Sequence, residues 1–575
     1  MNVPVIANPA ASADARFAAL AEADWAWRLG EFPQLATSVG ESSHDDRLER
    51  VDAASRAARL ARWRATREAL AAIAPGEMSA AARIDRAVFE EQLHGFIAHA
   101  ECHADRMPLN GDSSFFGPLV DLADAQPLRD ATDHRRFLAR LADIPRFLGE
   151  HVDLLREGLA TGYTVPRVVL EGRDQPLAAI ADLVDPEATP FWKPFARLPA
   201  GIGAAEQGAL QAEARRVIAT QVLPAYRELL RFLRETYVPG ARRTTAACDL
   251  PGGDAFYAAQ IRHYTTLPLS ADEVHRRGLA EVARILAEMA AVQAQAGFAG
   301  DLPSFLAFLR SDPQFYARTP HELLAHAAWI AKRIDGLLPK YFGLLPRQPY
   351  GVAPVPHDIA PFYTTGRYVP APQPVGCAGT YWVNTHALPS RALYTLPALT
   401  LHEAVPGHHL QIALAAEQAE QPAYRRHSFV DAYGEGWALY AEHLGDEMGV
   451  YLTPYEQFGR LTYEMWRAAR LVVDTGLHAK RWSRDQAREY LLAHTALSEH
   501  EVATEVDRYI GWPGQALSYK IGEMHIRMLR ARAERLLGAA FELRAFHDAV
   551  LALGSVPLGL LEEQVDAWIA RRRAA

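Results

Sequence analysis

Apolar and polar residues alternate along most of the chain with the period of an α-helix. Between residues 80 and 105, positions three or four apart form one apolar stripe, which consists of Ile84, Val88, Phe89 and Leu93. The same periodicity predicts helices over the ranges 133–162, 205–237, 270–297, 455–480, 483–496, 498–510, 520–537, 540–553 and 557–573. We therefore expect a mainly α fold.

The stretch from residue 346 to residue 389 departs from this pattern. Prolines cluster in it, and the short extended runs 350–352 and 380–384 carry residues typical of strands. We predict a small β-sheet here. If the second run is an edge strand, it would hold an extended substrate by main-chain hydrogen bonds, with Trp382 and Asn384 as candidate substrate-binding residues. A short structural hairpin fits the pattern equally well.

Residues 399–410 combine an apolar background with a His-Glu pair, a Pro-Gly break and a His-His pair. Burying such side chains without partners is costly, and a metal ion is the usual compensation. The zinc motif His-Glu-x-x-His places two imidazoles one helical turn apart, with the Glu beside the metal. Here His402 and Glu403 begin the motif, but Pro406 occupies the fourth position after His402. The alternative interpretation is a kinked core helix whose histidines bond to carbonyl groups.

We interpret the Pro-Gly pair as a two-residue insertion into the zinc motif, because proline disrupts a helix and glycine permits almost any backbone angle. Without it, His408 would stand four residues after His402. In an undistorted helix, His409 would share the face of His402 but lie about 10 Å further along the axis, too far for one zinc ion. We favour His408 as the second ligand and keep His409 as an alternative.

A third ligand is expected downstream, in the run 433–442. The apolar residues of this predicted helix leave Glu435 and Glu442 as candidate carboxylates. Glu435 lies between two glycines, which allow another backbone or a metal to come close. We favour Glu435, with Glu442 as the second candidate.

The segment 508–520 interrupts the C-terminal helices with polar donors around a Pro-Gly turn. Tyr519 is a candidate donor to a developing oxyanion, and Arg508 or Lys520 is a candidate for binding a substrate carboxylate. A core tyrosine and an arginine in an ion pair would give the same pattern.

The composition gives no support for a nucleic-acid-binding or membrane-spanning protein. The 575-residue chain has a formal net charge of −9, which gives no argument for binding nucleic acid or an anionic membrane. No apolar run is long enough to span a bilayer, and the first residues show no signal peptide. Three scattered cysteines (Cys102, Cys248 and Cys377) fit a reducing cytoplasm. We expect a cytoplasmic protein, or a periplasmic or secreted one if a leader has been removed.

The runs His-Glu-Ala-Val-Pro-Gly-His-His-Leu-Gln and Glu-Gly-Trp-Ala-Leu-Tyr-Ala-Glu resemble the bacterial domain-of-unknown-function 885 family (DUF885), whose members are regarded as zinc-metallopeptidase-like and carry an HExxPGHH motif. The resemblance continues through residues 379–384 and 508–520. More distantly, residues 435–438 are similar to a segment of aminopeptidase N relatives, which are gluzincin peptidases. Their Glu is the third zinc ligand, and this similarity implies the same role for Glu435.

Taken together, these features predict a zinc-dependent peptidase that cleaves short peptides. One Zn²⁺ per chain would be held by His402, His408 and Glu435, with Glu403 as general base. A helical body with a small sheet at the site is similar to thimet-oligopeptidase-like enzymes, which implies two helical lobes around a deep channel. We expect an N-terminal lobe over 1–245 and a catalytic lobe over 246–575, with one continuous, intertwined domain as the alternative.

Two other functions stay open at this point. The same site would also suit hydrolysis of a non-peptide amide or an ester. A non-catalytic helical binding protein with structural zinc is the second alternative, although a structural site needs no general base such as Glu403. The expected partner is a peptide substrate, with no nucleic acid and no membrane, and the pattern does not indicate an oligomeric state.

Overall fold

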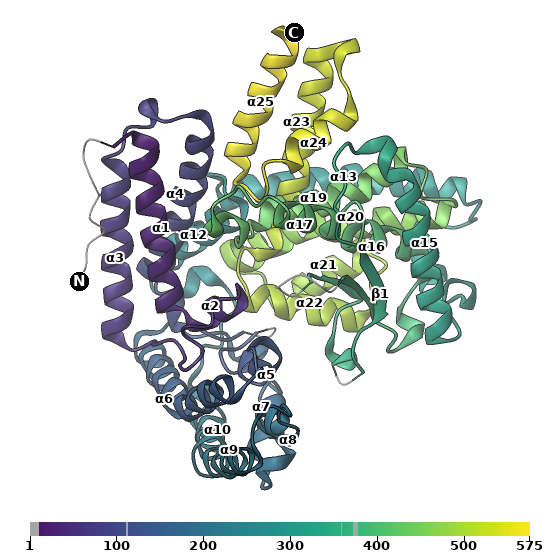
Figure 1. Cartoon of the computed structure of the whole chain (residues 1–575). Coiled ribbons are helices and arrows are strands. Elements are labelled where there is room, and N and C mark those ends of the chain that lie inside the picture. The colour runs from purple at the N-terminus through teal and green to yellow at the C-terminus, as the bar shows by residue number, and fades with distance from the viewer. Residues whose placement is uncertain (1–10, 111–112, 358, 372–377, 575) are drawn as a thin grey trace. The chain divides into compact units, whose positions relative to one another are not determined.

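The computed structural model describes residues 11–110, 113–357, 359–371 and 378–574. Cys377 and the N-terminal residues used in the signal-peptide expectation lie outside the described residues. The fold is mainly helical with one small sheet, as the sequence predicts (Figure 1). By compactness the chain divides into two units, Met1–Phe256 and Tyr257–Ala575.

The first unit is built from helices. Two of its longer helices begin at aspartates whose side chains accept hydrogen bonds from the first free N–H groups, Asp52 before α3 and Asp130 before α6. Helix α3 packs against α4, and α6 packs against α9 and α10. The bounds are α1 (Ala13–Glu31), α3 (Ala53–Ala71), α4 (Ala80–Glu101), α6 (Ala131–Thr161), α9 (Ala204–Val217) and α10 (Leu223–Phe232).

The second unit carries the motifs of interest. Two helix pairs form its centre, α13 with α20 and α19 with α23. Almost every side chain in the middle of α20 is buried. The bounds are α12 (Gly253–Thr265), which spans the boundary between the units, α13 (Ala271–Gln295), α15 (Pro320–Tyr341), α16 (Leu396–Glu403), α17 (His408–Ala416), α19 (Asp431–Glu447), α20 (Pro454–Lys480), α21 (Arg484–His494), α22 (Glu499–Gly511), α23 (Ser518–Leu537), α24 (Leu543–Leu551) and α25 (Leu558–Ala574).

The sheet lies beside α16. Its strands are β1 (Tyr350–Pro354), β2 (Gly366–Val369) and β3 (Gly379–Val383), in the order β1-β3-β2. Strand β3 runs parallel to β1 and antiparallel to β2. The predicted edge strand over 380–384 is therefore wrong: β3 has a neighbour on both sides, and its main chain cannot accept a further strand. Among the described strands, β1 and β2 form the edges.

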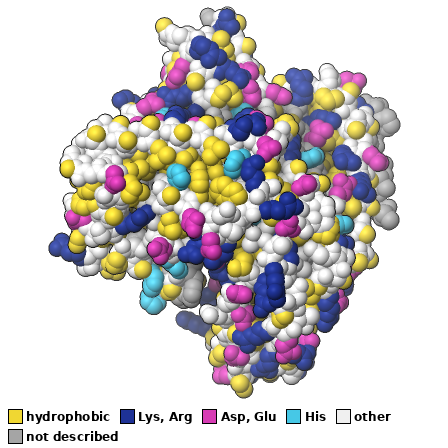
Figure 2. All heavy atoms as spheres, turned by 180° about the vertical axis from the view of Figure 1, so that it is seen from behind, with side chains coloured by type: hydrophobic (Ala, Val, Ile, Leu, Met, Phe, Trp, Pro, Cys, Tyr) yellow, Lys and Arg dark blue, Asp and Glu magenta, His cyan; other side chains and the backbone are white. Residues whose placement is uncertain are grey.

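The surface is mixed in charge. Acidic and basic side chains are interspersed over the face in Figure 2, in agreement with a small net charge for this length. Among the described residues, no helix combines the length and the apolar character that crossing a membrane requires.

Candidate metal centre

The Pro-Gly break separates α16 from α17 and brings His402 and His408 together. At Gly407, an added Cβ would lie 2.0 Å from the carbonyl oxygen of His402, so the chain turns too tightly here for any side chain. The N–H of His409 donates to the carbonyl of Ala404 across the break, at 3.1 Å. His402 thus lies in the last turn of α16 and His408 begins α17, with ring centroids 4.8 Å apart.

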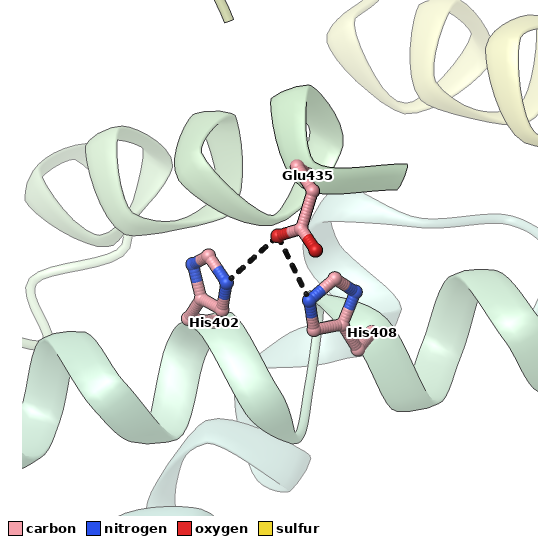
Figure 3. Close-up of side chains that lie close together, drawn as sticks. All are labelled: His402, His408 and Glu435. Atoms are coloured by element: carbon pink, nitrogen blue, oxygen red, sulfur yellow. Dashed lines mark ion pairs between the residues drawn. The ribbon is translucent and has the colours of Figure 1, made fainter. Parts of the chain in front are cut away.

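Glu435 of α19 completes a group that is able to hold a metal ion (Figure 3). Its Oε2 lies 3.5 Å from Nε2 of His402 and 3.4 Å from Nε2 of His408. Ligand atoms about 2.1 Å from a tetrahedral zinc ion are separated by about 3.4 Å, so these spacings fit such an ion. Oε2 of Glu435 is buried and has no hydrogen-bond partner among the described residues, as expected of an atom that could ligate a metal.

Glu442 lies behind His402 and is not in the group of three. Its Oε1 accepts a hydrogen bond from Nδ1 of His402 at 2.7 Å, and it is almost fully buried. This contact leaves Nε2 of His402 free to bind a metal, and such carboxylates commonly orient ligand histidines. Glu442, the second candidate for third ligand, therefore has a supporting position.

The charges of the metal-free group are strongly coupled. Burial opposes the charged form of His402, but Glu435 and Glu442 outweigh it and raise the pKa of His402 to about 9. Burial likewise opposes ionisation of Glu435, yet His408 and His402 hold the pKa of Glu435 far below its usual value. The side chains of His408 and Glu435 retain 11 % and 14 % exposure, so solvent reaches the group.

His409 points elsewhere. Its Nδ1 lies 3.0 Å from the hydroxyl of Tyr368 in β2, and its ring centroid is 4.6 Å from that of Tyr350 in β1. Of the two neighbouring histidines, only His408 belongs to the group with His402 and Glu435 in the described part of the chain.

Glu403 is held by the edge of the sheet. Its Oε2 accepts a hydrogen bond of 2.8 Å from the backbone N–H of Tyr368, and 9 % of the residue is exposed. The charge of Glu403 is among those that raise the pKa of His402, so this carboxylate lies near the candidate metal group. It combines a fixed orientation with limited access to solvent.

Close packing of α19 and α23 brings Tyr519 to the site. A Cβ on Gly436 would lie 2.5 Å from the backbone of Gly522, so neither helix tolerates a side chain at the crossing. The ring of Tyr519 stacks on that of His402 with centroids 6.4 Å apart. Burial, and then the charge of Glu435, raise the pKa of Tyr519, so its hydroxyl stays protonated as a hydrogen-bond donor.

Arg508 and Lys520 are both engaged by other side chains. Arg508 donates to Gln515 at 2.6 Å and to Glu505 at 3.0 Å. Lys520 is fully buried among three carboxylates at 2.8 to 3.0 Å, which belong to Glu281, Glu464 and Glu523. Lys520 therefore stabilises the interior of the second unit and is not placed to bind a substrate carboxylate.

The two candidates at β3, Trp382 within the strand and Asn384 directly after it, differ from each other. Asn384 is fully buried, and its amide nitrogen donates to the carbonyls of Ala360, Tyr363 and Thr364. These bonds hold the loop, and the amide nitrogen is already engaged by it. Trp382 is partly exposed and pairs across the strands with Arg367. Because Tyr381 faces α16 through Thr400, Trp382 lies on the opposite face of the sheet.

Sequence reasoning missed several residues at this centre. Asp431, one helical turn before Glu435, has its pKa raised to about 7 by burial and then by Glu435. Phe429 is 46 % exposed, with its ring centroid 6.5 Å from that of His408. The spacing of α19 contained a signal for Asp431, since residues four apart share a helix face. Nothing local pointed to Phe429 or to Tyr368.

These features define a mainly helical protein with a His₂Glu group of metal-binding type. The chain matches the family of bacterial proteins of unknown function DUF885 over residues 33–565 and therefore belongs to it. A putative lipoprotein from Colwellia psychrerythraea has a similar structure (TM-score 0.88, 27 % identity, 97 % of this chain and 100 % of that one).

A second solved structure, a putative lipoprotein of unknown function from Shewanella oneidensis, shares the fold at 18 % identity. Its TM-score is 0.74, and the match covers 95 % of this chain and 99 % of that one. No significant match was found among curated proteins.

Proposed function

We propose that this chain is a zinc-dependent peptidase that hydrolyses peptide bonds of short peptides. The observation that carries the proposal is the meeting of His402, His408 and Glu435 around one point, with Glu403 in the adjacent position. Two imidazoles and one carboxylate are the ligand set of many catalytic zinc sites, which keep one position open. A purely structural zinc site would need neither a solvent-accessible group nor a neighbouring carboxylate outside the ligand set.

Each residue around the proposed zinc ion has a separate role in hydrolysis. A bound Zn²⁺ would supply Lewis acidity, which activates water and polarises the scissile carbonyl. Glu403 accepts the proton of the attacking water and delivers it to the leaving amine. Tyr519 donates a hydrogen bond to the oxygen that develops negative charge. Glu442 keeps His402 in the orientation and tautomer that ligation needs.

The position of the peptide follows from β2. Among the described strands β2 is an edge, and its Tyr368 N–H points at Glu403. An extended peptide that lies along this edge would have its main chain aligned beside the metal group. Restriction to short peptides, through two lobes and a deep channel, is part of the proposal and rests on analogy with thimet-oligopeptidase-like enzymes.

The location is also part of the proposal. The relatives from Colwellia psychrerythraea and Shewanella oneidensis are both named as putative lipoproteins. These names favour a place outside the cytoplasm and do not support the cytoplasmic location expected from cysteine usage. We infer that the enzyme acts on peptides outside the cytoplasm.

Metal content and turnover test the function together. Protein purified without added metal should contain about one zinc per chain, lost in His402→Ala, His408→Ala and Glu435→Ala but kept in His409→Ala. Glu403→Gln should keep zinc and lower kcat on a peptide library about 10²- to 10⁴-fold. Glu420→Gln, an exposed carboxylate after α17, is the matched control. The proposal would be wrong if wild type bound no zinc when zinc is offered, or if Glu403→Gln had normal turnover.

A further inference from the structure

The second histidine of the His-His pair has no place in the metal group, yet it is almost fully buried, at 1 % exposure. Its Nδ1 lies 3.0 Å from the Tyr368 hydroxyl, at hydrogen-bonding distance, and its ring also lies against Tyr350 of β1. A histidine with this arrangement links α17 to the strands.

Tyr368 contacts both His409 and Glu403. Its hydroxyl is held by His409, while its backbone N–H donates to the Glu403 carboxylate at 2.8 Å. The phenol ring lies over Gly379 of β3, where an added Cβ would approach the hydroxyl to 2.2 Å. One residue of β2 thus joins His409 to Glu403, six positions earlier in the same motif.

Strand β2 needs such an anchor. It has four residues, and β3 is its only neighbouring strand in the described part of the sheet. Edge strands pair on one side only, so the orientation of an N–H on the open side is weakly determined by the ladder alone. The bond from α17 fixes the strand from the helix that also carries His408.

We propose that His409 and Tyr368 are a positioning pair that fixes β2, so that the Tyr368 N–H holds Glu403 in the orientation for proton transfer. The effect on catalysis rests on the proposed function, but the effect on the strand does not. The pair explains why the motif has two consecutive histidines: the first binds the metal and the second orients the general base.

Substitutions that keep or remove the Tyr368–His409 bond test the pair. Tyr368→Phe deletes only the hydroxyl, and His409→Leu deletes the imidazole that bonds to it. His409→Asn retains a polar group, able to donate or accept, near the place of Nδ1. Tyr350→Phe is the matched control, because this β1 tyrosine also contacts the His409 ring but its hydroxyl bonds to Asp335.

The expected kinetic result is specific to positioning. Tyr368→Phe and His409→Leu should each lower kcat about 3- to 10-fold with KM unchanged, which is the usual effect of one neutral hydrogen bond. The double variant should be no worse than either single variant, since both remove the same bond. His409→Asn and Tyr350→Phe should stay near wild type, and all variants should keep their metal. Wild-type kcat in Tyr368→Phe and His409→Leu, additive losses, or loss of metal in His409→Leu would overturn the proposal.

Hydrogen–deuterium exchange separates this inference from the proposed function. In metal-loaded protein, the amides of β2 should exchange faster in Tyr368→Phe and His409→Leu than in wild type or Tyr350→Phe. If wild type cleaves no peptide but β2 exchanges faster in these variants, the peptidase proposal fails and the anchoring of the strand stands. Unchanged exchange in β2 would overturn the positioning pair whatever the activity.

Discussion

Replacing Glu442 by Gln should weaken metal binding although this residue is not a proposed ligand. The side chain is almost fully buried and accepts the hydrogen bond from Nδ1 of His402 at 2.7 Å. Glutamine preserves the shape and the acceptor but removes the negative charge. The imidazole loses a charged partner that raises its basicity and holds its other nitrogen toward the metal.

The size of the effect follows from the surroundings of the carboxylate. Loss of such a supporting contact typically costs 10- to 100-fold in metal affinity, or about 1.4 to 2.7 kcal/mol. The guanidinium of Arg467 lies 3.8 Å from Oε1 of Glu442 and is itself nearly buried. Once the carboxylate is neutral, this cation is less compensated and also repels the metal. We therefore expect a loss near the upper end of the range.

Competition with a chelator of known affinity measures the effect directly. Glu442→Gln should bind zinc about 100-fold more weakly than wild type at the same pH. Glu447→Gln is the matched control, since Glu447 lies on the same helix but forms a more exposed ion pair with Arg530. Thermal unfolding of the metal-free proteins checks that both variants fold. Equal zinc affinity in wild type and Glu442→Gln would refute the role of Glu442 and, with it, His402 Nε2 as ligand.

Two further predictions concern the packing around the centre. Gly436→Ala should lower the free energy of unfolding in urea by about 1 to 3 kcal/mol, because its Cβ would lie 2.5 Å from the Gly522 backbone. Gly336→Ala in α15 should not lower it, because no packed neighbour among the described residues lies within 4 Å of the added Cβ. Burial raises the pKa of Asp474 to about 7. The folded state therefore favours the neutral acid. As the pH rises from 4 to 7, the free energy of unfolding of wild type should fall relative to that of Asp474→Asn by about 1.4 kcal/mol per pH unit. Parallel stability curves for the two proteins would contradict this assignment.

The sequence predicted those elements that local pattern determines. Helices expected over 133–162 and 270–297 are found as α6 (Ala131–Thr161) and α13 (Ala271–Gln295). Their periodic apolar stripes and N-terminal caps lie within the segment itself. The order of the strands could not be read in this way, because pairing joins segments up to thirty residues apart. Strand β3 was expected at an edge, whereas β1 and β2 flank it.

At the site, residue chemistry was more predictable than residue environment. The spacing of His402, His408 and Glu435 led to the group that the structure brings together. The substrate roles expected for Asn384 and Lys520 did not agree with their environment, since both are fully buried and satisfied by other groups. Burial is a tertiary property: a polar residue in a motif looks the same in sequence whether it lines a cleft or holds a loop.

The Pro-Gly insertion has a physical consequence beyond the kink. Consecutive residues of an α-helix point about 100° apart, so His408 and His409 at the start of α17 face different neighbours. Here α17 restarts at His408, so its first residue faces α19 while the next faces the sheet. The break thus lets one short segment contact the metal group and the strand that holds Glu403. Restoring a continuous helix would separate the contact of His408 with Glu435 from that of His409 with Tyr368. The insertion and the second histidine therefore act together.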